Sequence, residues 1–93
     1  MSSNRVTVID GNFLSDKKTA HAYISERLSF PEYYGGNLDA LHDCLACMGK
    51  RKIVLYAFDK AKQNLGSYAD SIIRVFIESA EENPSLTIFF DEN

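Results

Sequence analysis

The strongest constraint on the fold is that three short, strand-like segments are separated by segments with helical periodicity. The strand-like segments are residues 5–10, 53–56 and 86–90. Strands that alternate with helices pair in parallel through right-handed crossovers. The last two segments are apolar enough to predict strands covered on both faces. The sequence therefore predicts an α/β fold, with a small three-stranded parallel sheet and packed helices.

Capping residues and helix breakers mark the first helical segment. Ser15 is predicted to cap a helix over residues 16–28. Pro31 prevents this helix from continuing. His21 lies in a polar stretch of the same segment, and it is predicted to be an exposed, solvated side chain.

Two further helices are predicted between the second and third strands. Gly66 would close a short helix over residues 59–65. Ser67 and Asp70 have the spacing of a capping box, which predicts the start of a longer helix. Residues 83–84, Asn-Pro, would end that helix.

The helix that Asn37 opens has two faces of different character. One face is apolar at helical spacing and would face the core: Leu38, Leu41, Cys44, Leu45 and Met48. Four residues fall at positions i, i+3, i+4 and i+7 and therefore lie together on the opposite face: Asp39, His42, Asp43 and Ala46.

The two aspartates of this helix need an explanation, because like charges four residues apart cost about 0.2–0.5 kcal/mol. Asp39 lies in the first turn, where the helix dipole favours an acid, but Asp43 gains less from the dipole. Either this face is simply a solvated surface, or it is an acidic patch arranged for a cationic partner.

Length and composition indicate one small globular domain over residues 1–93. Hydrophobic residues make up 45% of the chain and charged residues 25%, which argues against disorder. The net charge of −3 weighs against direct binding of nucleic acid, which depends on clustered Lys and Arg. The sequence has neither a signal peptide nor an apolar run long enough to cross a membrane, so we expect a cytoplasmic protein.

The cysteines Cys44 and Cys47 lie one turn apart in the same predicted helix, and core packing is the favoured interpretation. A redox pair with this spacing normally begins a helix. A zinc site would need two more ligands, so we expect no metal and no cofactor. A small enzyme or redox protein using these thiols remains an alternative. Because no nucleophile or phosphate loop accompanies the acids, we do not expect an enzyme.

Residues 31–45 read Pro-Glu-Tyr-Tyr-Gly-Gly-Asn-Leu-Asp-Ala-Leu-His-Asp-Cys-Leu. This segment closely resembles the barstar family, intracellular inhibitors of the ribonuclease barnase, and the resemblance extends over nearly the whole chain. It implies a barstar-like fold. It also implies a monomeric, cytoplasmic protein that forms a 1:1 complex with a small basic secreted ribonuclease similar to barnase.

The resemblance further implies that an acidic helix and an aromatic loop plug the nuclease active site and mimic the phosphates of RNA. By matching position, Asp43 would be the main phosphate-mimicking acid, with Asp39 at the rim of the cleft. Tyr33 would pack against the catalytic groups of the nuclease. Leu38 would add apolar contact, and Glu78 would reach the nuclease from the long helix.

Gly35 and Asn37 would shape the loop, according to the same resemblance. Several positions of the contact segment depart from the family pattern. His42 stands where the family has a tryptophan, and the family's Thr-Gly-Trp is replaced by Ala46-Cys47-Met48. Since aromatic residues often dominate binding energy, these changes leave a second possibility open. The same fold could bind a different basic protein that is not a nuclease.

Overall fold

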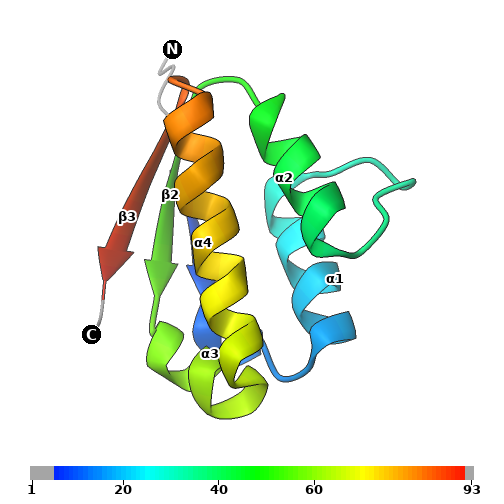
Figure 1. The fold of residues 1–93 in the computed structure, drawn as a ribbon, viewed down its shortest axis with the longest axis vertical. Coiled ribbons are helices and arrows are strands. Elements are labelled where there is room, and N and C mark those ends of the chain that lie inside the picture. The colour runs from blue at the N-terminus through cyan, green and yellow to red at the C-terminus, as the bar shows by residue number, and fades with distance from the viewer. Residues whose placement is uncertain (1–5, 92–93) are drawn as a thin grey trace.

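The computed structural model describes residues 6–91, which form a single sheet with helices packed against it (Figure 1). In chain order the elements are β1 (Val6–Asp10), the 3-10 turn η1 (Gly11–Phe13), α1 (Lys17–Leu28), α2 (Leu38–Ala46), β2 (Arg51–Tyr56), α3 (Phe58–Leu65), α4 (Ser67–Glu82) and β3 (Leu86–Asp91). The sheet has the order β1-β2-β3, and both neighbouring pairs are parallel. The predicted three-stranded parallel α/β fold is confirmed.

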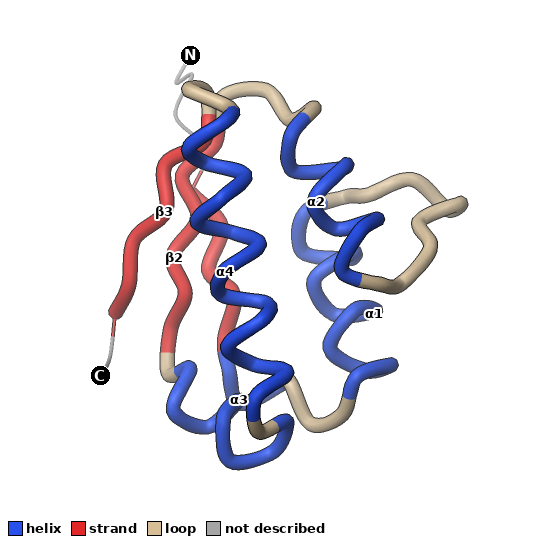
Figure 2. Tube along the Cα trace, viewed as in Figure 1, coloured by secondary structure: helices blue, strands red, loops and turns tan. Residues whose placement is uncertain are grey.

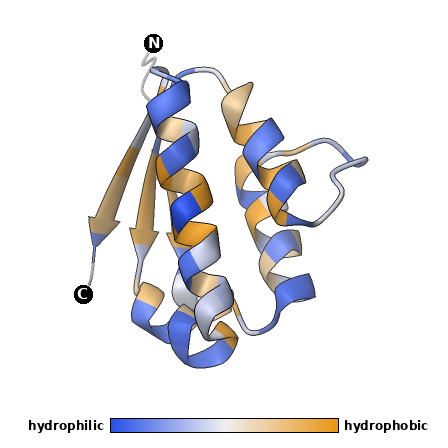
Figure 3. Ribbon diagram, viewed as in Figure 1, coloured by the Kyte–Doolittle hydropathy of each residue, from blue (hydrophilic) through white to orange (hydrophobic). Residues whose placement is uncertain are grey.

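The helices cover one face of the sheet and leave the other face open. Ile9 and Leu55 are register partners on the covered face, and both are buried. Val8, Val54 and Phe89 are neighbours on the open face, where Val8 is 38% and Phe89 46% exposed. Figure 3 shows that the strands are nonetheless largely apolar. The prediction that the last two strands are covered on both faces is wrong, because crossovers of the same hand in this strand order place their helices on one side.

The core lies between the covered face of the sheet and the helices. Ile72 and Phe76 of α4 and Leu41 and Leu45 of α2 are fully buried in it. α4 packs against both β3 and α2, so α2 lies on the side of α4 away from β3 (Figure 1). Among the helices of residues 6–91, none is both long and apolar enough to span a bilayer.

α1 begins one residue later than predicted. Asp16, and not Ser15, is the N-cap, and its Oδ1 accepts a hydrogen bond of 2.8 Å from the backbone N–H of Thr19. That hydrogen bond lowers the pKa of the Asp16 carboxyl. A charged cap also interacts favourably with the helix dipole. This explains why the Asp16 carboxylate, and not the hydroxyl of Ser15, caps the helix.

α3 runs into α4 through Gly66, whose φ of 60° suits glycine. The predicted closure of α3 at Gly66 is therefore confirmed. Ser67 is already helical and caps nothing, so the predicted capping box of Ser67 and Asp70 is wrong. Asp70 instead forms an ion pair with Lys62 of α3, at 3.4 Å between Oδ1 and Nζ. This contact depends on how α3 and α4 meet, which local sequence does not show.

Candidate functional site

The segment between α1 and α2 projects from the side of the molecule away from the sheet (Figure 2). We call residues 31–36 of this segment the aromatic loop. Ser29 leaves α1 in the left-handed conformation, with φ 57°. The amide of Tyr34 donates to the carbonyl of Pro31 at 3.0 Å, and Gly36 has a φ of 70° that favours glycine. The loop is therefore a defined turn that delivers the chain to α2.

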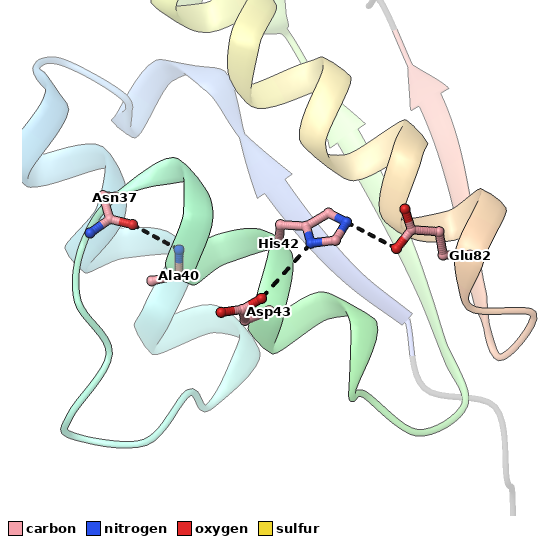
Figure 4. Close-up of polar contacts among 5 residues, drawn as sticks. All are labelled: Asn37, Ala40, His42, Asp43 and Glu82. Carbon is pink, nitrogen blue, oxygen red and sulfur yellow. Dashed lines mark hydrogen bonds and ion pairs between the residues drawn. The ribbon is translucent and has the colours of Figure 1, made fainter.

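Asn37 begins α2 as predicted. Its side-chain Oδ1 accepts a 2.7 Å hydrogen bond from the backbone N–H of Ala40 (Figure 4). Gly35 lies against this cap, since a Cβ on Gly35 would be 3.3 Å from Asn37 Nδ2 and 3.5 Å from Ala40 Cβ. A larger residue at Gly35 would crowd the cap, so these two residues define where α2 starts.

α2 has the two faces expected from its sequence. Its buried face consists of fully buried and half-buried leucines: Leu38, Leu41 and Leu45. On the other face Asp39 is exposed and the Asp43 side chain is 86% exposed, whereas Ala46 is half-buried. Burial of the leucines fixes the rotation of the helix, so both carboxylates are held toward solvent.

A groove of about 480 Å³ runs between the aromatic loop and the C-terminal half of α2. Tyr33, which is 87% exposed, lines one wall, and Asp43 and Met48 line the other. Phe30 and Pro31 add further apolar surface. The fold thus brings Tyr33 and Asp43 to one surface, as the resemblance implies.

His42 connects α2 to α4 (Figure 4). Its Nε2 lies 3.1 Å from Glu82 Oε1, and its Nδ1 lies 4.0 Å from Asp43 Oδ1. Glu78 is exposed one turn before Glu82 on α4, so both acids follow the same face of that helix. Glu82 was not among the residues predicted for the site, although it contacts the candidate site residue His42. The available signal was its spacing of four residues from Glu78.

Asn83 fixes the C-terminal end of α2 against the end of α4. Its Nδ2 donates to the carbonyl oxygens of Leu45 at 2.9 Å and Met48 at 3.0 Å. Asn83 is only 8% exposed. Carbonyls at a helix C-terminus lack partners within the helix, so this side chain caps α2 from outside.

The cysteines contribute less to the core than predicted. Cys44 is half-buried, but Cys47 is exposed and lines the groove. Core packing is therefore wrong for Cys47, which has rotated past the buried face where α2 ends. Burial, followed by the charge of Asp43, raises the pKa of the Cys44 thiol, which makes it a poor nucleophile. Within residues 6–91, no group of three or more His, Cys, Asp or Glu side chains could hold a metal ion.

His21 is buried, contrary to the prediction that it is solvated. It is 3% exposed and lies behind the aromatic loop, within hydrogen-bond distance of the hydroxyls of Tyr34 and Tyr68. Burial lowers the pKa of His21 and raises that of Tyr34. The local sequence is polar, but partners from distant segments satisfy the imidazole.

A sequence model of the family described as Barstar (barnase inhibitor) matches residues 4–91. The chain belongs to the barstar family. The parallel α/β fold described above is barstar-like, as predicted. A Bacillus subtilis (strain 168) protein named "Putative ribonuclease inhibitor YrdF" is 40% identical over 80 residues, which cover 84% of this chain and 88% of that protein. Membership of the barstar family supports a role as a ribonuclease inhibitor.

Proposed function

We propose that this barstar-family protein inhibits a small basic ribonuclease of the barnase type by occupying its active site with α2 and the aromatic loop. The observation that carries the proposal is the arrangement of Tyr33 and Asp43 on one groove. Asp43 is exposed on a helix whose other face is locked in the core. A surface of this kind is complementary to a cleft lined with cations.

The proposed mechanism needs no covalent chemistry. Asp43, with Asp39 one turn earlier, stands in for RNA phosphates and pairs with the cations that would bind them. Tyr33 covers the catalytic groups, and Glu78 extends the acidic surface from α4. RNA is excluded because its site is filled. Charge complementarity also speeds encounter, an effect for which the barnase–barstar pair is itself the standard example.

The proposed inhibitor has a cellular compartment and a binding stoichiometry. The inhibitor acts in the cytoplasm as a monomer and forms a 1:1 complex with a ribonuclease that the same cell or a neighbouring cell secretes. Leu38 supports the base of the loop, while Gly35 and Asn37 hold its shape. His42 and Ala46 occupy contact positions where the family has larger side chains, so they select among nucleases.

The test is an RNA-cleavage assay in which the protein is titrated against barnase and a panel of related basic ribonucleases. We expect stoichiometric loss of activity for at least one nuclease. We also expect that Asp43→Ala abolishes most of this inhibition. Asp59→Ala, which removes an exposed acid from the first turn of α3, is the matched control and should inhibit like the wild type.

A second candidate function is the binding of a basic protein that is not a nuclease. It is favoured by one observation, the replacement of the family's contact tryptophan by His42, whose ring is engaged with Glu82. Failure to inhibit any ribonuclease, together with Asp43-dependent binding of another basic protein, would favour this alternative.

A further inference from the structure

The aromatic loop is tied to two distant helices through a single imidazole. His21 comes from α1, its Nδ1 lies 2.7 Å from the hydroxyl of Tyr34 in the loop, and its Nε2 lies 2.7 Å from the hydroxyl of Tyr68 in α4. We infer that His21 is a positioning residue, which clamps the aromatic loop in the conformation described above. The consequence for binding rests on the proposed function, whereas the effect on the loop does not.

The clamp acts on the residue next to the exposed aromatic side chain. Tyr34 is held by His21, and its ring also packs on Phe30, with 5.0 Å between ring centroids. Tyr33 is 87% exposed, so consecutive side chains of the loop lie on opposite sides of the backbone. Because Tyr34 is fixed, the backbone from which Tyr33 projects is fixed as well. The loop then loses less conformational freedom when a partner binds.

The surroundings favour the neutral form of His21. A neutral imidazole has one N–H donor and one acceptor nitrogen, which suits one hydroxyl that accepts and one that donates. Lys17 Nζ lies 4.7 Å from the centre of the Tyr68 ring, and Lys18 lines the same hollow between α1 and the loop. Glu32 is the acidic residue along that hollow. A buried imidazolium would face nearby cations, and it would require both hydroxyls to act as acceptors.

Tyr68→Phe is the sharpest test, because it changes neither the loop nor α1. It removes one hydroxyl and keeps the ring that contacts Lys17 and His21. We expect chymotrypsin, which cleaves after aromatic residues, to cut after Tyr33 and Tyr34 about fivefold faster in this variant. Cleavage follows the population of the opened loop when opening is fast. Tyr34→Phe keeps both cleavage sites and should behave similarly.

Tyr23→Phe is the matched control. Tyr23 also lies on α1, and its hydroxyl accepts a 3.0 Å hydrogen bond from the backbone N–H of Asp10, away from the loop. This variant should lose one hydrogen bond of similar strength but be cut in the loop at the wild-type rate. Equal acceleration in Tyr23→Phe and Tyr68→Phe would show global unfolding and would overturn the inference. No acceleration in Tyr68→Phe would also overturn it.

The effect of the His21 clamp on ribonuclease inhibition is measured in a separate experiment. His21→Gln should lose both contacts, and we expect it to be cut faster still and to inhibit a responsive ribonuclease several-fold less well. Tyr23→Phe should inhibit like the wild type. If the wild type inhibits no ribonuclease, the proposed function fails. The cleavage comparison still decides whether His21 positions the loop.

Discussion

Asp43 and Tyr33 have side chains that are almost fully exposed, at 86% and 87%. Exposed side chains of this kind add little to folding stability, and substitutions there usually change it by less than about 0.5 kcal/mol. Asp43 and Tyr33 can therefore be changed without unfolding the protein. This separation makes the assignment of the site testable one residue at a time.

Asp43→Ala should weaken binding of an inhibited ribonuclease by at least about 2 kcal/mol, which is about 30-fold in Kd. The reason is that the main anion opposite the nuclease cations is lost. The melting temperature should stay within a few degrees of the wild type, since the substitution also removes repulsion from Asp39. Inhibition assays and thermal unfolding measure both effects. A variant that still inhibits at the wild-type concentration would contradict the role of Asp43.

Stability should depend on pH through His21. Burial holds its pKa in the folded protein below the ordinary value of 6.5. Between those two pKa values the unfolded chain binds more protons than the folded protein, so the free energy of unfolding should fall as pH drops below about 6.5 and be constant above it. Urea unfolding between pH 5 and 8 measures this.

His21→Gln provides the comparison for the pH experiment. The variant should show a smaller decrease in the free energy of unfolding at low pH, while the contributions of the other titrating groups are present in both proteins and cancel in the difference. An identical pH slope in the wild type and the variant would show that His21 is not the group responsible.

At the scale of elements, α2 is held at both ends. Asn37 caps its start through Ala40, and Asn83 caps its end from α4. His42 adds a contact to Glu82. α2 and α4 therefore act as one rigid unit that carries the acids of both helices.

Asn83→Ala should destabilise the protein by about 1–3 kcal/mol, because the carbonyls of Leu45 and Met48 lose a buried donor. Asn12→Ala is the matched control: among residues 6–91, the Asn12 side chain donates only to Asp10, at an exposed position. It should cost less than about 0.5 kcal/mol. Chemical denaturation measures both values. Equal losses of unfolding free energy in the two variants would show that the cap of α2 contributes no more to stability than an exposed hydrogen bond does.

The sequence predicted best the features that depend on neighbouring residues. The start of α2 follows from Asn37, and its two faces follow from the spacing of its leucines and aspartates. The structure places these as predicted. Residues that depend on tertiary contacts were predicted poorly. His21 was expected in solvent because its sequence neighbours are polar, whereas its partner Tyr68 is far along the chain. Glu82 was missed because its contact with the candidate site residue His42 forms only when α4 packs on α2.

At the scale of the whole molecule, the net charge of −3 has the sign that the proposed basic nuclease would attract. Salt screens exposed charges, with a Debye length of about 8 Å at physiological ionic strength. The association rate with an inhibited ribonuclease should therefore fall as salt is raised, and stopped-flow mixing would measure it. Asp43→Ala should show a shallower dependence. A rate that does not change with salt would contradict electrostatic mimicry of RNA.

The strand order has a consequence for how the protein folds. Val6 at the start of β1 pairs with Lys52 near the start of β2, and Arg51 at the start of β2 pairs with Leu86 at the start of β3. The strands are parallel, so no two neighbouring strands are joined by a hairpin. Each strand pair must wait for a long intervening segment to close, and such non-local contacts slow folding. The helices, including the one that carries Asp43, have local backbone hydrogen bonds, but their packing partners come from distant segments. The start and the two faces of α2 are therefore encoded locally, while the loop and the groove beside them keep their shape only once α4 is in place.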